Sequence, residues 1–157
     1  MAQKTYPMTA VGKQKLQKKL EYLRLHKRPA VIKQIKIALG YGDLSENFEY
    51  TSAKKEQSLL ENKISTIEHM LQYSEVVDNA NTDQDVVNVG RKVTFKKVPN
   101  GKPATYEIVG QSEADPLKGK IANDSPIAQG LIGHKLNETV SIKVPAGTMK
   151  VKIVKVE

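Results

Sequence analysis

Two segments that share one apolar spacing constrain the fold of this chain more than any other feature. Seam positions recur at alternating steps of four and three residues between residues 16 and 37, and again between residues 53 and 71, which is the spacing of a narrow coiled coil. The seam comprises Leu16, Leu20, Leu23, Lys27, Ala30, Gln34 and Ile37 in the first segment and Ala53, Gln57, Leu60, Ile64, Ile67 and Leu71 in the second. Facing positions keep a nearly constant sum of residue numbers. The pattern therefore predicts an antiparallel hairpin with Leu23 opposite Ile67 and Ala30 opposite Leu60.

The sequence also predicts where the two helices begin and end. Thr9 is the predicted N-cap of the first helix, because its hydroxyl can accept a bond from the first turn. Pro29 lies inside the pattern, and its missing N–H and its ring predict a kink or short break near residues 26–28. Gly40 and Gly42 are expected to end the first arm. Asp43 or Ser45 is expected to cap the second.

The turn between the arms differs in charge from the arm before it. Residues 1–39 hold ten Lys and Arg against one Glu, whereas residues 41–50 hold Asp43, Glu46 and Glu49 and no base. On a helical turn Asp43 and Glu46 would share one side. Two carboxylates supply only part of the six-oxygen shell that Mg²⁺ prefers. The tip is therefore interpreted as half of a metal site that a partner completes, with a solvated acidic turn as the plainer alternative.

Beyond the polar segment 79–85 the apolar period changes from helical to alternating. Strands are predicted at Val87 and Val89 and over 92–95, 105–109, 138–144 and 149–156, with turns at 99–101 and 145–147. Ser125 and Pro126 predict the N-cap and first residue of one short helix. The expected fold is α+β: an N-terminal antiparallel α-helical coiled-coil hairpin over 1–77, a linker over 78–85, and a small, mostly antiparallel β-sheet domain with one short helix over 86–157.

The sequence lacks the residues that several classes of function require. The chain has no cysteine, its three histidines are scattered without metal-ligand spacing, and it contains no P-loop, G-x-S-x-G or Rossmann glycine pattern. No stretch approaches about 18 uninterrupted apolar residues. We expect a cytoplasmic monomer without membrane association.

Two longer motifs resemble those of a known family. Residues 42–47 (Gly-Asp-Leu-Ser-Glu-Asn), followed by Glu49 and Tyr50, resemble the tip motif of bacterial Gre transcript cleavage factors of the GreA type. Residues 125–133 (Ser-Pro-Ile-Ala-Gln-Gly-Leu-Ile-Gly) resemble the motif of their C-terminal domain. The resemblance extends over nearly the whole chain.

The resemblance implies a transcription elongation factor whose coiled-coil finger enters the secondary channel of a backtracked bacterial RNA polymerase. Asp43 and Glu46 would be the catalytic tip residues, helping to hold the second Mg²⁺ against the extruded 3′ end of the nascent RNA. Under this expectation the free protein binds no cofactor, Mg²⁺ is held only in the complex with RNA polymerase, and the chain is not an enzyme by itself.

The resemblance also assigns supporting roles. Asn47, Glu49 and Tyr50 would support the shape of the tip. The second domain is expected to be FKBP-like and to dock on the polymerase through Ser125, Pro126 and Ile127. Contacts to RNA or to the channel walls are expected from four lysines of the arms, namely Lys33, Lys36, Lys54 and Lys55.

Two alternatives stay open. Leu39 and Phe48 depart from the residues common in the family, which fits a channel-binding modulator or inhibitor of RNA polymerase that stimulates no cleavage. An FKBP-like sheet also suggests a prolyl isomerase. The pocket of such an enzyme needs an aromatic lining, and the only aromatic residues in 78–157 are Phe95 and Tyr106, so this function is disfavoured.

Overall fold

The computed structural model describes residues 4–42, 46–80 and 82–157 and divides the chain into two compact units. One unit comprises Met1–Lys13 together with Ser74–Glu157, and the other comprises Gln14–Tyr73. The expected hairpin domain over 1–77 therefore differs at both ends, because the first and last residues of that range belong to the sheet unit.

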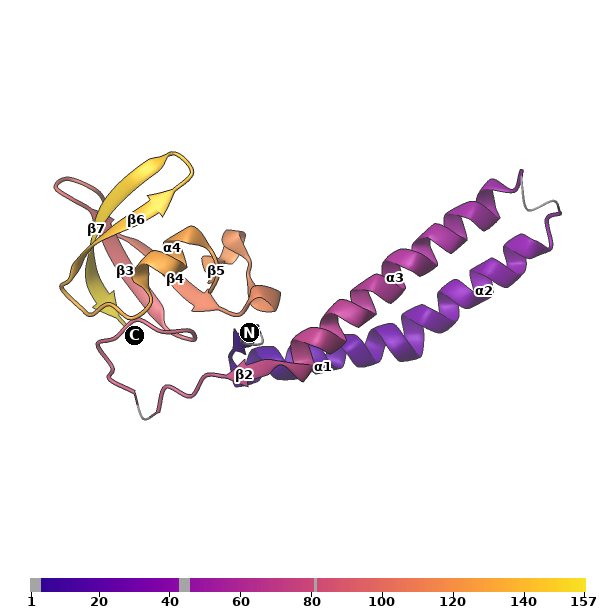
Figure 1. Ribbon diagram of the computed structural model, residues 1–157, viewed down its shortest axis with the longest axis horizontal. Helices are drawn as coiled ribbons and strands as arrows, with labels where there is room; N and C mark the ends of the chain where they lie inside the picture. The colour runs from indigo at the N-terminus through magenta and orange to yellow at the C-terminus, as the bar shows by residue number, and fades with distance from the viewer. Residues whose placement is uncertain (1–3, 43–45, 81) are drawn as a thin grey trace. The chain divides into compact units, whose positions relative to one another are not determined.

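The helical unit is an antiparallel pair of arms, as the apolar spacing predicts. The first arm consists of α1 (Ala10–Tyr22), a π-helical turn η1 (Leu23–Lys27) and α2 (Arg28–Leu39), and the second is α3 (Phe48–Gln72). Figure 1 shows α2 and α3 running side by side in opposite directions. The buried face of α3 contains Ala53, Leu60, Ile64 and Ile67, which confirms four of the six predicted seam positions of the second arm. The other two, Gln57 and Leu71, are half-buried, and Met70 is buried beside Leu71.

The break expected near Pro29 takes the form of the π-helical turn. The N–H of Arg28 donates to the carbonyl of Leu23, five residues earlier, instead of the residue four earlier. Pro29 cannot donate a bond, and its ring would clash with the carbonyl of the preceding α-helical turn. The wider turn relieves that clash and inserts one residue into the helical period.

This extra residue moves the seam of the first arm, so part of the predicted register is wrong. Lys27, Ala30, Gln34 and Ile37 are exposed, whereas Val31 and Ala38 are buried and Ile35 is half-buried. The buried series therefore restarts one position later than a regular heptad would place it. Val31, not Ala30, supplies the apolar side chain of that layer.

The seam position nearest the π-turn is taken by an ion pair. Arg28 donates from Nε and Nη2 to the two carboxylate oxygens of Glu61 at 2.8 and 2.9 Å. This bidentate hydrogen bond raises the pKa of Arg28 above its usual value. Arg24 with Glu68, and Lys27 with Glu56, add two further pairs between the arms.

The second unit contains a mixed five-stranded sheet in the order β5-β4-β3-β7-β6. Its strands are β3 (Lys92–Lys97), β4 (Ala104–Val109), β5 (Lys120–Ala122), β6 (Thr139–Val144) and β7 (Gly147–Val156). The predicted hairpin around 145–147 is confirmed, since β6 and β7 are antiparallel across it. The sheet is mostly antiparallel as expected, and its one parallel pair is β4 with β5. The strand predicted at Val87 and Val89 is absent from the described strands, and only an isolated bridge joins Val86 to Lys135 there.

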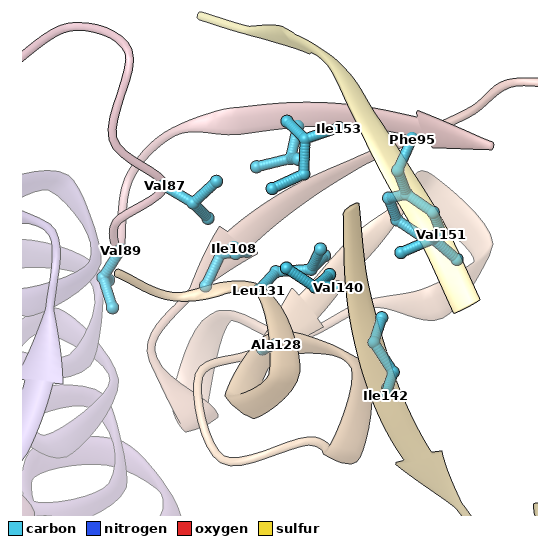
Figure 2. Packing of buried hydrophobic residues seen from close by; sticks show 11 residues of the cluster. Val87, Val89, Phe95, Ile108, Ala128, Leu131, Val140, Ile142, Val151 and Ile153 are labelled. Carbon is cyan, nitrogen blue, oxygen red and sulfur yellow. The ribbon is translucent and has the colours of Figure 1, made fainter. Parts of the chain in front are cut away.

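The core of this unit lies between the sheet and the short helix α4 (Pro126–Leu131). Figure 2 shows its buried side chains, which come from β3, β4, β6, β7, α4 and the segment before β3. Ser125 Oγ accepts a bond from the N–H of Ala128, which confirms the predicted cap of α4. Gly130 permits close packing, because a Cβ there would lie 2.8 Å from Cγ1 of Ile142.

The N-terminal residues join this unit through β1 (Tyr6–Met8), which pairs in parallel with β2 (Ser74–Val76). Thr9 caps α1 as predicted, accepting from the N–H of Gly12 at 3.0 Å. The Thr9 hydroxyl also donates to Glu113 at 2.9 Å. A Cβ on Gly12 would lie 2.1 Å from Cδ of Glu113, so the carboxylate rests directly on the first helical turn. These contacts explain why residues 6–12 belong with the sheet unit.

The predicted linker is also bonded to the sheet unit. Arg91 is only 6% exposed, and its guanidinium donates to the carbonyls of Asp83 and Asn79 and to the hydroxyl of Thr82. Asn79 donates to the carbonyl of Val89 at 2.8 Å. Residues 79–85 are therefore a packed loop in the described parts of that segment and not a free connector.

Among the described residues, no helix combines the length and the apolar character needed to cross a membrane.

The shifted seam predicts which side chains stabilise the arms. Val31 is 2% exposed, so Val31→Ala should lower the free energy of unfolding by about 2 kcal/mol through lost burial and a small cavity. Ile37 is 51% exposed, so Ile37→Ala should cost less than about 1 kcal/mol. Urea unfolding followed by far-ultraviolet circular dichroism measures both. A larger loss for Ile37→Ala would support the unshifted register instead.

Candidate functional site

The first arm ends at a defined position ahead of the tip. α2 stops at Leu39, and the amides of Gly40 and Tyr41 bond back to the carbonyls of Ile37 and Ala38. Gly42 has a φ of +114°, a conformation that only glycine adopts without strain. The chain therefore leaves the helical path at the glycines that the sequence indicated.

Asn47 bonds to both arms at the base of the tip. Its Oδ1 accepts from the N–H of Tyr50 at 3.1 Å and so caps α3. Its Nδ2 donates to the carbonyl of Ala38 at 2.7 Å, which also accepts from the N–H of Tyr41 just after the end of α2. The cap was expected at Asp43 or Ser45, and both lie outside the described residues. Because α3 begins at Phe48, the capping position belongs to Asn47.

The described carboxylates of the tip point to solvent. Glu46 is exposed in a bend before α3, and Glu49 is exposed in the first turn of α3, where the helix dipole favours negative charge. Asp43, the other predicted catalytic and metal-binding residue, lies outside the described residues. Glu46 precedes α3, and its placement relative to Asp43 lies outside the described residues.

Within residues 4–42, 46–80 and 82–157, no group of three or more His, Cys, Asp or Glu is arranged to hold a metal ion. The described carboxylates of the tip are compatible with a partial set of oxygen ligands.

Two aromatic side chains stand beside these acids. Phe48 is 87% exposed at the first position of α3, and Tyr41 is also exposed. Together with Glu46, Asn47 and Glu49 they line an open hollow of about 410 Å³. The sequence motifs predicted no binding role for Phe48. Its position outside the seam was an available signal, because an apolar residue there has no partner helix to cover it. Tyr50, expected to support the tip, is half-buried in the first turn of α3 and donates its amide to Asn47.

The lysines expected to contact RNA are placed on both arms. Lys33 and Lys36 are exposed on α2, and Lys54 and Lys55 are exposed on α3. Lys54 Nζ donates to Gln57 Oε1 at 3.1 Å. These four cations are therefore available to solvent on the half of the hairpin nearer to the tip in sequence.

The residues predicted to dock on a partner have mixed environments. Pro126 is exposed, and Ser125 is half-buried and serves as the cap of α4. Ile127 is half-buried and packs against the sheet core. Their docking role stays a prediction, and the structure shows that Ser125 and Ile127 also have structural contacts.

Comparisons with known proteins point to one family. The family profile for the N-terminal domain of transcription elongation factors matches residues 6–76, and the profile for the C-terminal domain of GreA and GreB matches residues 81–157. Transcription elongation factor GreA 2 of Lactiplantibacillus plantarum is 63% identical over 154 residues, covering 98% of this chain and 96% of that protein. GreA of Limosilactobacillus fermentum is 56% identical over 155 residues, covering 99% and 98%.

Solved structures include a more distant match. The crystal structure of GreA factor homolog 1 of Thermus thermophilus aligns over 98% of this chain and 99% of that chain, with 22% identity and a TM-score of 0.45. This identity and this TM-score are too low to support a conclusion about this chain.

The double role of Asn47 is testable through stability. Asn47→Ala removes the cap of α3 and the bond to Ala38, and we expect a loss of about 1–2 kcal/mol in the free energy of unfolding. Asn47→Ser keeps a capping oxygen but no amide donor, so it should lose about half as much. Urea unfolding of the three proteins gives the ranking. Equal stability of Asn47→Ala and the parent would contradict the role.

Proposed function

Because the chain belongs to the GreA/GreB family of transcription elongation factors, we propose that it binds RNA polymerase and stimulates cleavage of the nascent RNA in backtracked complexes. The observation that supports this most directly is the exposed carboxylate of Glu46 at the junction of two paired helical arms. No described residue forms an ion pair with it. A surface carboxylate without an intramolecular partner is available to a site on another protein.

The arms give the tip a defined base. Apolar packing of α2 against α3 and the Asn47 bond to Ala38 hold the end of α2 close to the start of α3. Glu46 is therefore adjacent to a residue, Asn47, that is fixed by hydrogen bonds to both arms. This restraint lowers the conformational entropy that Glu46 loses when it enters a partner's site. The exposed lysines of α2 and α3 would contact polyanionic RNA or the channel walls.

The proposed reaction needs a divalent metal, and the residues fit a share of its ligands. Asp43 and Glu46 would hold Mg²⁺ together with carboxylates of the polymerase, since two carboxylates leave most of the octahedral shell to other donors. When bound, the ion would supply charge stabilisation and an activated water for phosphodiester hydrolysis. The chain itself would contribute oriented carboxylates and no independent catalysis. Docking on the polymerase would involve Ser125, Pro126 and Ile127.

The cleavage assay tests the tip directly. Asp43→Asn and Glu46→Gln keep the shape of each side chain and remove its charge, and each should lower the rate of 3′-end RNA cleavage by a factor on the order of 10². Affinity for the polymerase should change little, because the tip carboxylates act mainly in the transition state. Glu21→Gln, an exposed acid of α1, is the matched control and should cleave like the parent.

Raising the Mg²⁺ concentration should partly restore each tip variant, because a weakened site fills again at higher metal concentration. Parental cleavage rates in both tip variants would refute the assignment. A parent protein that binds the polymerase but yields no cleavage would favour a modulator or inhibitor, the function that the 87% exposed Phe48 keeps open.

A shared metal site also predicts weak binding to the protein alone. Calorimetric titration of the free protein with MgCl₂ should give no binding in the micromolar range, because the tip supplies too few ligands. The Glu46→Gln variant serves as the blank. Micromolar binding that this variant loses would mean that the protein holds the ion by itself.

A further inference from the structure

Two exposed aromatic rings lie at the tip, and the cleavage reaction proposed above does not use them. Phe48 is 87% exposed at the start of α3, and Tyr41 is 66% exposed two residues after the end of α2. Both side chains line the open hollow of about 410 Å³, together with Glu46, Asn47 and Glu49. This tip hollow has the volume of an ordinary small-molecule site, for which about 300–1,000 Å³ is typical. Each arm thus presents one ring to a space that admits a planar group.

These two rings are not held by packing within the protein. Among the described residues, no contact with another ring or with a cation involves Tyr41 or Phe48. The other phenylalanine of the chain, Phe95, is 5% exposed and stacks on Tyr106 at a centroid distance of 5.6 Å. A single exposed apolar residue is ordinary on a protein surface. Two exposed rings that line one hollow form a surface suited to a flat ring on the ligand.

The charge of the tip hollow restricts what the ligand can be. Glu46 and Glu49 are exposed in its lining, and none of its described lining residues is basic. These carboxylates would repel a phosphate group. A purely apolar side chain of a partner would cover them without offering a hydrogen bond, which is costly for a carboxylate. A nucleobase is uncharged, has a face that stacks on aromatic rings, and carries amino groups that donate to carboxylates.

We propose that Phe48, together with Tyr41, stacks on an unpaired base of the extruded RNA 3′ end and so holds the RNA beside the tip carboxylates. This role rests on the proposed function, because cleavage requires the RNA 3′ end to reach Glu46. Phe48 follows Glu46 by two residues, and Asn47 between them is fixed by hydrogen bonds to both arms. A base on the ring of Phe48 therefore belongs to the part of the RNA that reaches the carboxylates.

A lysine on the same face of α3 fits the backbone of such an RNA. Phe48 and Lys55 are seven residues apart, so they share one face of the helix at a separation of about 10.5 Å along its axis. Lys55 is exposed, as Phe48 is. Proteins hold single strands by combining rings that stack on bases with cations that follow the backbone. The ring at the tip and the cation two turns away are the two components of such a site.

Fluorescence of 2-aminopurine at the RNA 3′ end measures the stacking without cleavage. Bacterial RNA polymerase complexes backtracked by one nucleotide, which extrude only this base, are titrated with the full chain in the absence of Mg²⁺. The parent protein should quench the fluorescence, because an aromatic ring stacked on 2-aminopurine depopulates its excited state. Phe48→Leu keeps an apolar side chain but loses the ring, so it should lose most of the quenching at saturating protein, whereas Phe48→Trp should retain it.

The matched control lies on the same helix. Leu59 is 61% exposed on α3, so Leu59→Ala removes an exposed apolar side chain away from the tip hollow and should quench like the parent. Tyr41→Ala should lose part of the quenching and Tyr41→Phe none of it, since the ring and not the hydroxyl makes the contact. Equal quenching by Tyr41→Ala and the parent would contradict the two-ring site.

Affinity distinguishes a base from a protein partner. Loss of one base-stacking ring weakens binding by about 5- to 150-fold, so Phe48→Ala should bind the backtracked complex more weakly than the parent by a factor in that range. The two proteins should bind equally well when the extruded 3′-terminal nucleotide is abasic. If Phe48→Ala loses as much affinity for the abasic complex, Phe48 contacts a side chain of the polymerase, and the base-stacking role is overturned.

The same complexes with Mg²⁺ present separate this role from the proposed function. A parent protein that stimulates cleavage but quenches no fluorescence, or a Phe48→Leu variant that quenches as strongly as the parent, would overturn the stacking role alone. A parent protein that quenches fluorescence but stimulates no cleavage would refute the proposed function and retain the contact between base and ring. A parent protein that does not bind the polymerase would refute both.

Discussion

The pairing of the two arms depends on a proline that cannot donate a hydrogen bond. Pro29 would clash within a regular α-helix, and the π-helical turn over Leu23–Lys27 removes the clash by adding one residue to the period. Every apolar contact of α2 then follows from this insertion, since Val31 and Ala38 become the buried positions. The arm remains continuous because Arg28 bonds back to Leu23 and pairs with Glu61. A break that would otherwise weaken the arm is bridged by backbone and side-chain bonds together.

Individual polar side chains then connect segments that apolar packing alone does not hold together. Asn47 bonds to the end of α2 and to the start of α3. Glu113 contacts the first turn of α1, and Arg91 donates hydrogen bonds to carbonyls of the loop before β3. Asn47 and Arg91 bond to backbone groups of other segments, whereas Glu113 accepts from the hydroxyl of Thr9, the cap of α1. The tip, the N-terminal segment and the loop thus each depend on a few hydrogen bonds whose removal has local effects.

The charges of the helical hairpin are segregated along the chain. The described acids of the tip, Glu46 and Glu49, are exposed beside Phe48, and the lysines of α2 and α3 are exposed further along the arms. Coordinating a metal and neutralising phosphates need opposite charges. Their separation lets each surface keep its own sign without forming ion pairs with the other.

The sequence by itself determined the features that arise within one element or between neighbours along the chain. The buried face of α3, the caps Thr9 and Ser125, the β6–β7 hairpin and the acidic tip follow from side-chain period and local hydrogen bonding. The placement of Asp43 lies outside the described residues. The tertiary structure decided the rest: the parallel pairs β1–β2 and β4–β5, and the extra residue that the π-turn adds to the period of the first arm. Strand pairing depends on contacts between different segments, about which apolar spacing along one segment carries no information. Pro29 indicates that the helix is interrupted but not whether the interruption adds a residue.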